Sequence, residues 1–229
     1  MLFLQMMAFV ASLYWGQVPP DARVLLEPWK GPYGGIPPFD KVEVGAFKPA
    51  LEAAMAENLA EIDQIANNTA APTFANTIEA LERSGDTYQR VTTIYSIFTG
   101  TMSTPELQSI EREMAPKQAA FRDRINQNGA LFKRIKAVYD SPEKAKLSSE
   151  QQRLVWVYYN NFVRAGAIHD DAAKARVAAI NQQLAKLFTT FNQNLLADES
   201  KEYKAADGSV VKNTRSSRRT ASGDKRTGV

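Results

Sequence analysis

The single histidine of this chain bears directly on metal chemistry, because hydrolytic zinc sites on helices use two imidazoles one turn apart with a glutamate between them. His169 precedes Asp170 and Asp171 at an expected helix start. One imidazole cannot supply an HExxH motif, so we interpret His169 as an exposed loop residue and not as a ligand or a base. The chain has no cysteine, which excludes disulfides, iron–sulfur ligation and thiolate zinc sites within it.

Paired carboxylates are the second candidate for catalysis. Glu79 and Glu82 lie close together in the sequence, as do Glu111 and Glu113. A glycosidase needs two carboxylates that face each other across a cleft, whereas two glutamates on one helix surface usually form a solvated face. Glu79 and Arg83 stand one helical turn apart, which favours a surface ion pair. We therefore assign no catalytic, cofactor-binding or metal-ligating residue.

Phosphate and nucleic-acid binding have weak support in the sequence. No strand precedes Gly31, Gly34 and Gly35 and no GK[ST] follows them, so they do not form a phosphate loop. The basic run KNTRSSRR at 212–219 contains no aromatic residue for base stacking. It is interpreted as a generic polybasic tail, without a specific nucleic-acid partner. Residues 201–229 carry a charge of +5 and the rest of the chain −2, so the tail alone sets the net charge of +3.

Composition divides the 229 residues into three parts. Residues 1–25 begin with the apolar run MLFLQMMAFVASLYW, which is shorter than the ~20 residues of a membrane-spanning helix. It either acts as a signal peptide that directs export to the periplasm, or packs on the body of a cytoplasmic protein, or results from a mis-set start codon. Residues 26–199 form the body. Residues 200–229 contain few core-forming side chains and are expected to be disordered.

The body is expected to be all-α, with about seven helices in one bundle-like domain, because apolar residues recur every three or four positions from about residue 44 to 198. Thr73 and Ser103 are the expected N-caps of two helices. Ser148 with Gln151 predicts a capping box for another. The Pro- and Gly-rich stretch 28–40 is expected to be an extended arm that lies across a surface.

The last expected helix begins near Asp170–Asp171 and carries a nearly heptad apolar seam, which is typical of a long antiparallel bundle helix. The seam consists of Val177, Ile180, Leu184, Leu187, Phe191 and Leu195. Beyond it, only 209–211 resembles a strand, and weakly.

Several longer strings carry a resemblance to a known family. They include PPFDKVEVGAFKPALEAAMAENLAEIDQI (37–65), PTFANTIEALERSG (72–85), TPELQSIEREMAPKQAAFRDRI (104–125) and EQQRLVWVYYNNFVRAGA (150–167). In collinear order over about residues 26–199, the chain resembles the N-terminal part of the thimet oligopeptidase superfamily of zinc metallopeptidases. Within that superfamily it is most similar to the peptidyl-dipeptidase Dcp branch.

The resemblance implies an almost wholly helical protein with two halves around a deep channel that admits short peptides. In that family zinc is bound by HExxH and a downstream glutamate, all in the C-terminal half. No zinc ligand or catalytic residue can therefore be carried onto this chain, and no cofactor is expected in it. Residues 40–199 would form one wall of the channel.

The end of the chain departs from the family pattern. Asn213–Ser217 (NTRSS) matches a family stretch but follows far too soon, and RRTASGDKRTGV matches nothing in the family. An internal deletion followed by a frameshift or premature stop would produce this arrangement.

Three hypotheses follow. The chain is an inactive N-terminal fragment of a peptidase, or a free-standing helical module that binds short peptides or regulates a peptidase, or a nucleic-acid binder through its basic tail. The channel-facing wall is also expected to expose an apolar or semi-polar surface that invites self-association.

Overall fold

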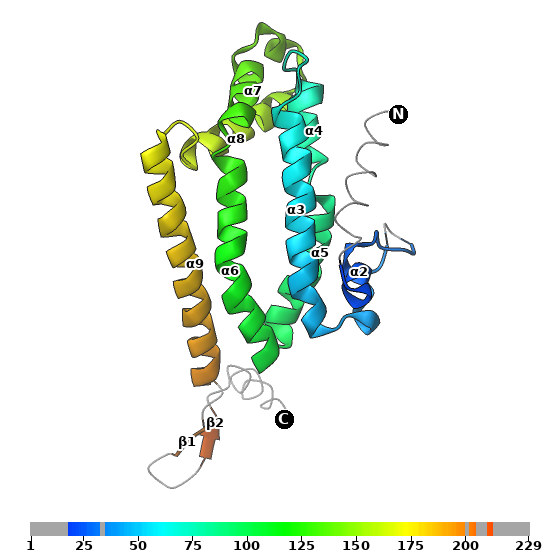
Figure 1. Ribbon diagram of the computed structural model, residues 1–229, viewed down its shortest axis with the longest axis vertical. Coiled ribbons are helices and arrows are strands. Elements are labelled where there is room, and N and C mark those ends of the chain that lie inside the picture. The colour runs from blue at the N-terminus through cyan, green and yellow to red at the C-terminus, as the bar shows by residue number, and fades with distance from the viewer. Residues whose placement is uncertain (1–17, 33–34, 200–201, 205–209, 213–229) are drawn as a thin grey trace, which may run out of the picture. The chain divides into compact units, whose positions relative to one another are not determined.

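The computed structural model describes residues 18–32, 35–199, 202–204 and 210–212 (Figure 1). The chain divides into two compact units, Met1–Ala185 and Lys186–Val229. The helices and strands in order are α2 (Pro20–Leu26), η1 (Phe39–Lys41), η2 (Val44–Ala46), α3 (Phe47–Ala66), η3 (Phe74–Glu79), α4 (Ala80–Glu82), α5 (Asp86–Thr101), α6 (Pro105–Asn126), α7 (Gly129–Asp140), η4 (Pro142–Lys146), α8 (Ser149–Arg164), α9 (Asp171–Glu199), β1 (Glu202–Lys204) and β2 (Val210–Lys212). The all-α prediction is confirmed.

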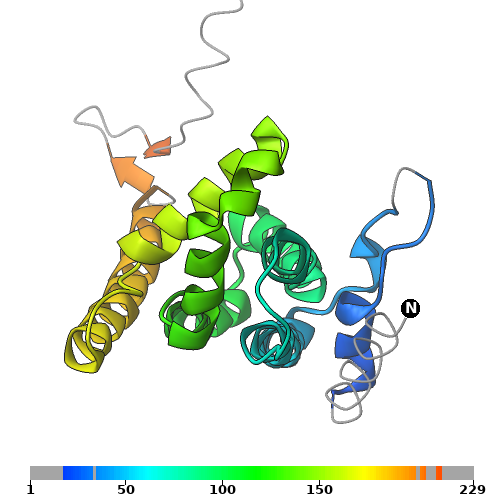
Figure 2. The same cartoon turned by 90° about the horizontal axis from the view of Figure 1, so that it is seen from above.

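Helix α3 organises the first unit, because it packs against α2, α5, α6 and α7. Figure 2 shows α3, α5 and α6 side by side when they are seen from above. The first of two hydrophobic cores lies between these helices, around Phe47. The Phe47 ring contacts Tyr95 and Phe98 edge-on, at 5.3 and 5.1 Å between ring centroids. Leu51 of α3 and Leu107 of α6 are fully buried in the same cluster. The amphipathic spacing of α3 thus places one buried face against several neighbours.

A second core lies at the carboxyl-terminal end of α3, where η3, α7 and α8 meet. Ile65, Ile78 and Ile135 are buried in it. Stacked rings extend this core, with Tyr139 and Tyr159 separated by 4.0 Å between centroids. Tyr158, Tyr159 and Phe162 of α8 therefore pack in this core, whereas Trp156 is exposed.

The expected helix starts are correct in two cases and displaced by one residue in a third. Thr73 and Ser148 both form capping boxes. The N-cap of α6 is Thr104 and not Ser103, because the Thr104 side chain accepts a hydrogen bond from the Leu107 backbone N–H. The Ser103 hydroxyl instead accepts a hydrogen bond from the Gln108 amide. Both residues precede Pro105 closely, so sequence spacing alone could not separate them.

The segment before α3 contains one short helix, followed by the predicted irregular arm. Helix α2, which the sequence did not predict, buries Ala22, Leu25 and Leu26 in the first core. After it, Lys30 and Ile36 form an isolated antiparallel bridge. The Phe39 ring then stacks on Phe98 at 6.5 Å. This ring contact confirms the prediction that the arm lies across a surface of the body.

Helix α9 differs from the predicted bundle helix, because its apolar seam is not covered by the described residues. Ile180, Leu184, Leu187, Phe191 and Leu195 are all exposed. Residues 171–185 belong to the first unit, where Asn181 donates a 2.7 Å hydrogen bond to Asp123 of α6. The heptad spacing correctly predicted a long helix, but it did not indicate whether another part of the protein would cover the apolar seam.

Two short strands lie in the segment that was expected to be disordered. β1 and β2 pair antiparallel, with Tyr203 opposite Val211. β2 overlaps the weak strand signal at 209–211. The remainder of the expected tail, and the apolar run at the start of the chain, lie outside the described residues. Among the helices that are described, none has the length and hydropathy needed to span a membrane.

Candidate functional site

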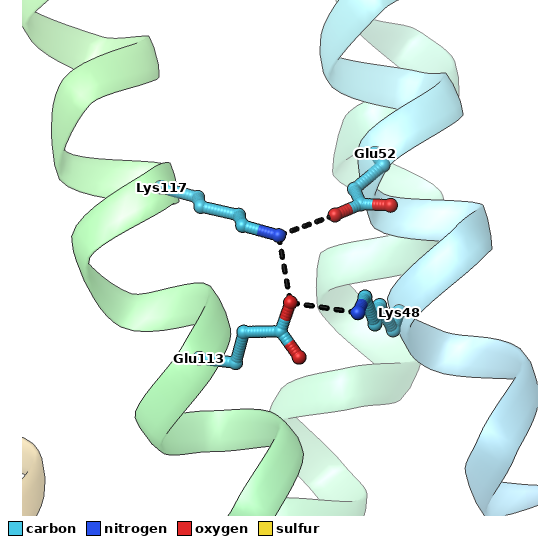
Figure 3. Close-up of polar contacts among 4 residues, drawn as sticks. All are labelled: Lys48, Glu52, Glu113 and Lys117. Carbon is cyan, nitrogen blue, oxygen red and sulfur yellow. Dashed lines mark hydrogen bonds and ion pairs between the residues drawn. The ribbon is translucent and has the colours of Figure 1, made fainter.

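Four alternating charges bridge α3 and α6 and form the most extensive ion-pair cluster on the described surface (Figure 3). Lys48 and Glu52 come from α3, and Glu113 and Lys117 come from α6. The Lys117 ammonium lies 2.6 Å from Glu52 and 2.8 Å from Glu113, and Lys48 lies 2.7 Å from the same oxygen of Glu113. All four side chains are about two-fifths exposed.

The electrostatics of this cluster stabilise the charged forms of its members. Hydrogen bonds from Lys117 and Lys48 lower the pKa of Glu113 below its ordinary value. Hydrogen bonds to Glu113 and Glu52 raise the pKa of Lys117. A general acid or base needs a pKa near the working pH, and both shifts move away from neutrality. The cluster therefore joins two helices and is not suited to proton transfer.

A buried polar network lies between α3 and α5. The Thr87 hydroxyl donates a 3.0 Å hydrogen bond to Glu57, and the Arg90 guanidinium donates to Thr87 and to the Leu26 carbonyl. One turn away, Glu61 accepts from the Gly85 backbone N–H at 2.7 Å. Burial raises the pKa of Glu61. These contacts tie α2, α3 and α5 together. Glu61 also lines a surface pocket between α3 and η3.

Arg134 is the most deeply buried cation of the described residues, with 6% of its surface exposed. It extends from α7 to the loop between α3 and η3. Its guanidinium donates to the carbonyls of Asn68 at 2.6 Å and Ala70 at 3.0 Å, and to the Asn76 side chain at 2.9 Å. Every one of these acceptors lies in or beside one loop, so Arg134 fixes the entry of the chain into η3.

Two surface pockets flank η3. One of about 490 Å³ lies between η3 and η4 and is lined by Phe74, Val138 and Leu147 with Lys144 at its edge. Lys144 is already engaged, because its ammonium donates to the Tyr139 carbonyl at 2.6 Å. The other pocket, of about 320 Å³, lies between α3 and η3. Neither brings together a nucleophile, a base and an orienting partner, which acyl or phosphoryl transfer would require.

The residues that the sequence singled out do not meet in one place. His169 is exposed and its backbone N–H donates to the Gly166 carbonyl. Asp170 accepts from the Ala173 backbone N–H and caps α9. Glu79 pairs with Arg83, as expected from their spacing. Glu82, the other member of that carboxylate pair, accepts a 2.6 Å hydrogen bond from the Tyr158 hydroxyl.

Zinc does not fit the described residues. A zinc site needs three or four nitrogen, sulfur or carboxylate ligands within about 2.3 Å of one point. Over the ranges that the structure describes, no three side chains of His, Asp or Glu gather in that way. In the cluster of Figure 3, the carboxylates of Glu52 and Glu113 each face an ammonium group.

Comparison with known proteins identifies relatives of this chain. The family model of the N-terminal domain of neurolysin and thimet oligopeptidase matches residues 50–174. Dipeptidyl carboxypeptidase of Escherichia coli (strain K12) is 39% identical over 161 residues, which cover 70% of this chain and 24% of the relative. Organellar oligopeptidase A of Arabidopsis thaliana is 29% identical over 168 residues, 73% of this chain and 21% of the relative. The chain thus spans less than a quarter of the length of these relatives.

Proposed function

Because this chain belongs to the neurolysin and thimet oligopeptidase family through the N-terminal domain of that family, we propose that residues 40–199 form a non-catalytic wall of a peptidase channel. By steric exclusion, the wall admits short peptides to the channel and keeps folded proteins out. The chain on its own hydrolyses no peptide and holds no structural zinc.

The observation that carries this proposal is the single histidine. An HExxH zinc motif needs two imidazoles on one helix face, so it cannot be formed within these 229 residues. Asp170, Arg134 and the four charged residues of Figure 3 support the same role, because they serve as a helix cap, a loop anchor and an interhelical ion-pair cluster. Side chains used in this way build a rigid surface and do not perform chemistry.

Direct assays test the inactivity of the chain. The purified full chain is incubated with zinc, dialysed and analysed by mass spectrometry for metal, and then assayed on short fluorogenic peptides. We expect less than a tenth of a zinc ion per chain, as a rough threshold for a site without enough ligands, and no hydrolysis above buffer. One tightly bound zinc per chain, or peptide cleavage that chelators abolish, would overturn the proposal.

A chimaera tests the role as a wall. The region of the E. coli dipeptidyl carboxypeptidase that matches this chain is replaced by the corresponding residues of this chain. We expect the chimaera to release dipeptides from short peptides and to leave native ubiquitin intact. A chimaera that folds and binds zinc but also degrades native ubiquitin would contradict steric exclusion.

The two alternative functions make distinct predictions. A free-standing peptide-binding module would give a saturable calorimetric titration with short peptides, whereas the wall proposal gives a flat one. A nucleic-acid binder would be retained on DNA in a manner that falls steeply with salt, and deletion of residues 201–229 would abolish this retention.

A further inference from the structure

Helix α9 carries a continuous stripe of large apolar side chains that the described residues leave exposed. The stripe consists of Ile180, Leu184, Leu187, Phe188, Phe191 and Leu195. At about 100° of rotation per residue, these six positions fall within a sector of about 100° around the helix axis. Exposure is greatest in the middle, at 66% for Leu187 and 63% for Phe188 and Phe191. Monomeric proteins rarely expose so many large apolar groups together.

The spacing of these residues along α9 is palindromic, because their positions are symmetric about one midpoint. Leu187 and Phe188 are adjacent at the centre. The next pair outward is Leu184 and Phe191, and the outermost pair is Ile180 and Leu195. Each pair is equidistant from the midpoint between 187 and 188. Because α9 is one continuous helix, its backbone sets these spacings without reference to any other part of the chain.

A palindromic stripe matches a second, antiparallel copy of itself. When one α9 is rotated by 180° about an axis through its midpoint, Ile180 comes opposite Leu195 of the other copy and Leu184 comes opposite Phe191. This is an isologous contact, in which the same surface serves both partners. We propose that two copies of this chain associate through α9, with the helices antiparallel and a two-fold axis between Leu187 and Phe188.

The area of the stripe reaches the lower limit for a specific contact between two copies. At about 200 Å² for a fully exposed side chain of this size, the exposed fractions amount to roughly 600 Å² per copy. An antiparallel pair would then bury on the order of 1,200 Å², which is at the lower limit for specific interfaces. The pair is therefore a weak to moderate dimer whose population depends on concentration.

Sedimentation equilibrium of the full chain at several concentrations tests the association. We expect a mass that rises with concentration toward twice 25.4 kDa. Leu187→Glu places two like charges beside the axis and is expected to raise the dissociation constant about 100-fold or more. Thr190→Glu is the matched control, because Thr190 is exposed on α9 outside the stripe. The proposal is wrong if the chain stays monomeric at all concentrations or if both variants behave like the parent.

Cross-linking tests the orientation, and the absence of native cysteine makes each introduced thiol unique. Leu184→Cys and Phe191→Cys chains, one of them tagged to differ in mass, are mixed and oxidised with diamide. The antiparallel pair predicts a mixed disulfide between the two variants. Two Leu184→Cys chains alone should react poorly, since their thiols would lie about 10 Å apart along the axis, beyond the ~7 Å limit between Cα atoms. Disulfides of Leu184→Cys with itself that form as readily as mixed ones would refute this orientation.

Discussion

Replacement of Arg134 tests how strongly one buried cation holds the loop before η3. Arg134→Met retains a long apolar stem and removes the guanidinium, so the carbonyls of Asn68 and Ala70 and the side chain of Asn76 each lose a charged donor. A hydrogen bond to a charged group contributes about 1.5–3 kcal/mol. Ala70 is exposed and Asn68 is half-buried, so water will replace part of the loss.

We therefore expect the free energy of unfolding to fall by about 3 kcal/mol. The measurement is urea denaturation followed by circular dichroism, in which this change lowers the midpoint by about 1.5 M at a slope of about 2 kcal/mol/M. Hydrogen exchange should localise the effect, with loss of protection at the amides of residues 68–77. Arg134→Lys should recover less than half of the stability, because an ammonium is a single point donor and cannot reach all three acceptors.

The neighbouring residue provides the control for this prediction. Lys133 lies beside Arg134 on α7 but is exposed, so Lys133→Met should change the unfolding free energy by less than about 0.5 kcal/mol. If Arg134→Met remains within about 1 kcal/mol of the parent protein, the guanidinium does not anchor the loop.

Three further predictions concern local structure. Thr104→Ala should reduce thermal stability by about 1 kcal/mol, as expected for a lost N-cap, whereas Ser103→Ala should cost less than half as much; equal losses would contradict the assignment of the cap. Gly85→Ala should destabilise by more than about 1 kcal/mol, because Gly85 has a φ of +80° and an added Cβ would lie 3.1 Å from Asn58. Gly100→Ala, with no atom within 4 Å of the added Cβ, should be neutral or stabilising in the same chemical denaturation. Folding lowers the pKa of Glu113, so the contribution of Glu113 to the stability of the fold is complete above the ordinary pKa of 4.5 and is lost as the pH falls through the pKa of the folded state. The difference in unfolding free energy between the parent and Glu113→Gln should therefore vanish in acid. A difference that persists in acid would refute the ion pairing.

The helices of the body could be predicted because their signals are local. Ser148 and Gln151 lie three residues apart, and a capping box requires no information beyond that spacing. The same holds for the ion pair between Glu79 and Arg83, which a single helical turn brings together. The starting residue of α6 was less determined, because Ser103 and Thr104 are both good N-caps and only the backbone conformation distinguishes them.

Contacts between distant segments could not be predicted in this way. The cluster in Figure 3 joins Glu52 to Lys117 across 65 positions of sequence, and no periodic pattern marks the two residues as partners. Arg134 likewise looked like one more cation on an amphipathic helix. A one-letter pattern does not show that its guanidinium is buried against a loop that lies 64 positions away.

Helix α2 could not be predicted from local signals, because its sequence has a weak helix pattern and lies in a proline-rich region. Seven residues are too few to form a stable helix alone. Burial of Leu25 and Leu26 against α3 and α5 supplies the stabilisation that local propensity lacks.

The sequence by itself determined the helical class, most helix boundaries, the family resemblance and the impossibility of an HExxH motif in a chain with one histidine. These follow from residue identity, spacing and count. Only the tertiary structure decided which apolar faces are covered. The seam of α9 has the same periodicity as the buried face of α3, yet the described residues cover one and leave the other exposed. Periodicity records that a helix has an apolar face, whereas burial depends on whether another surface lies against it.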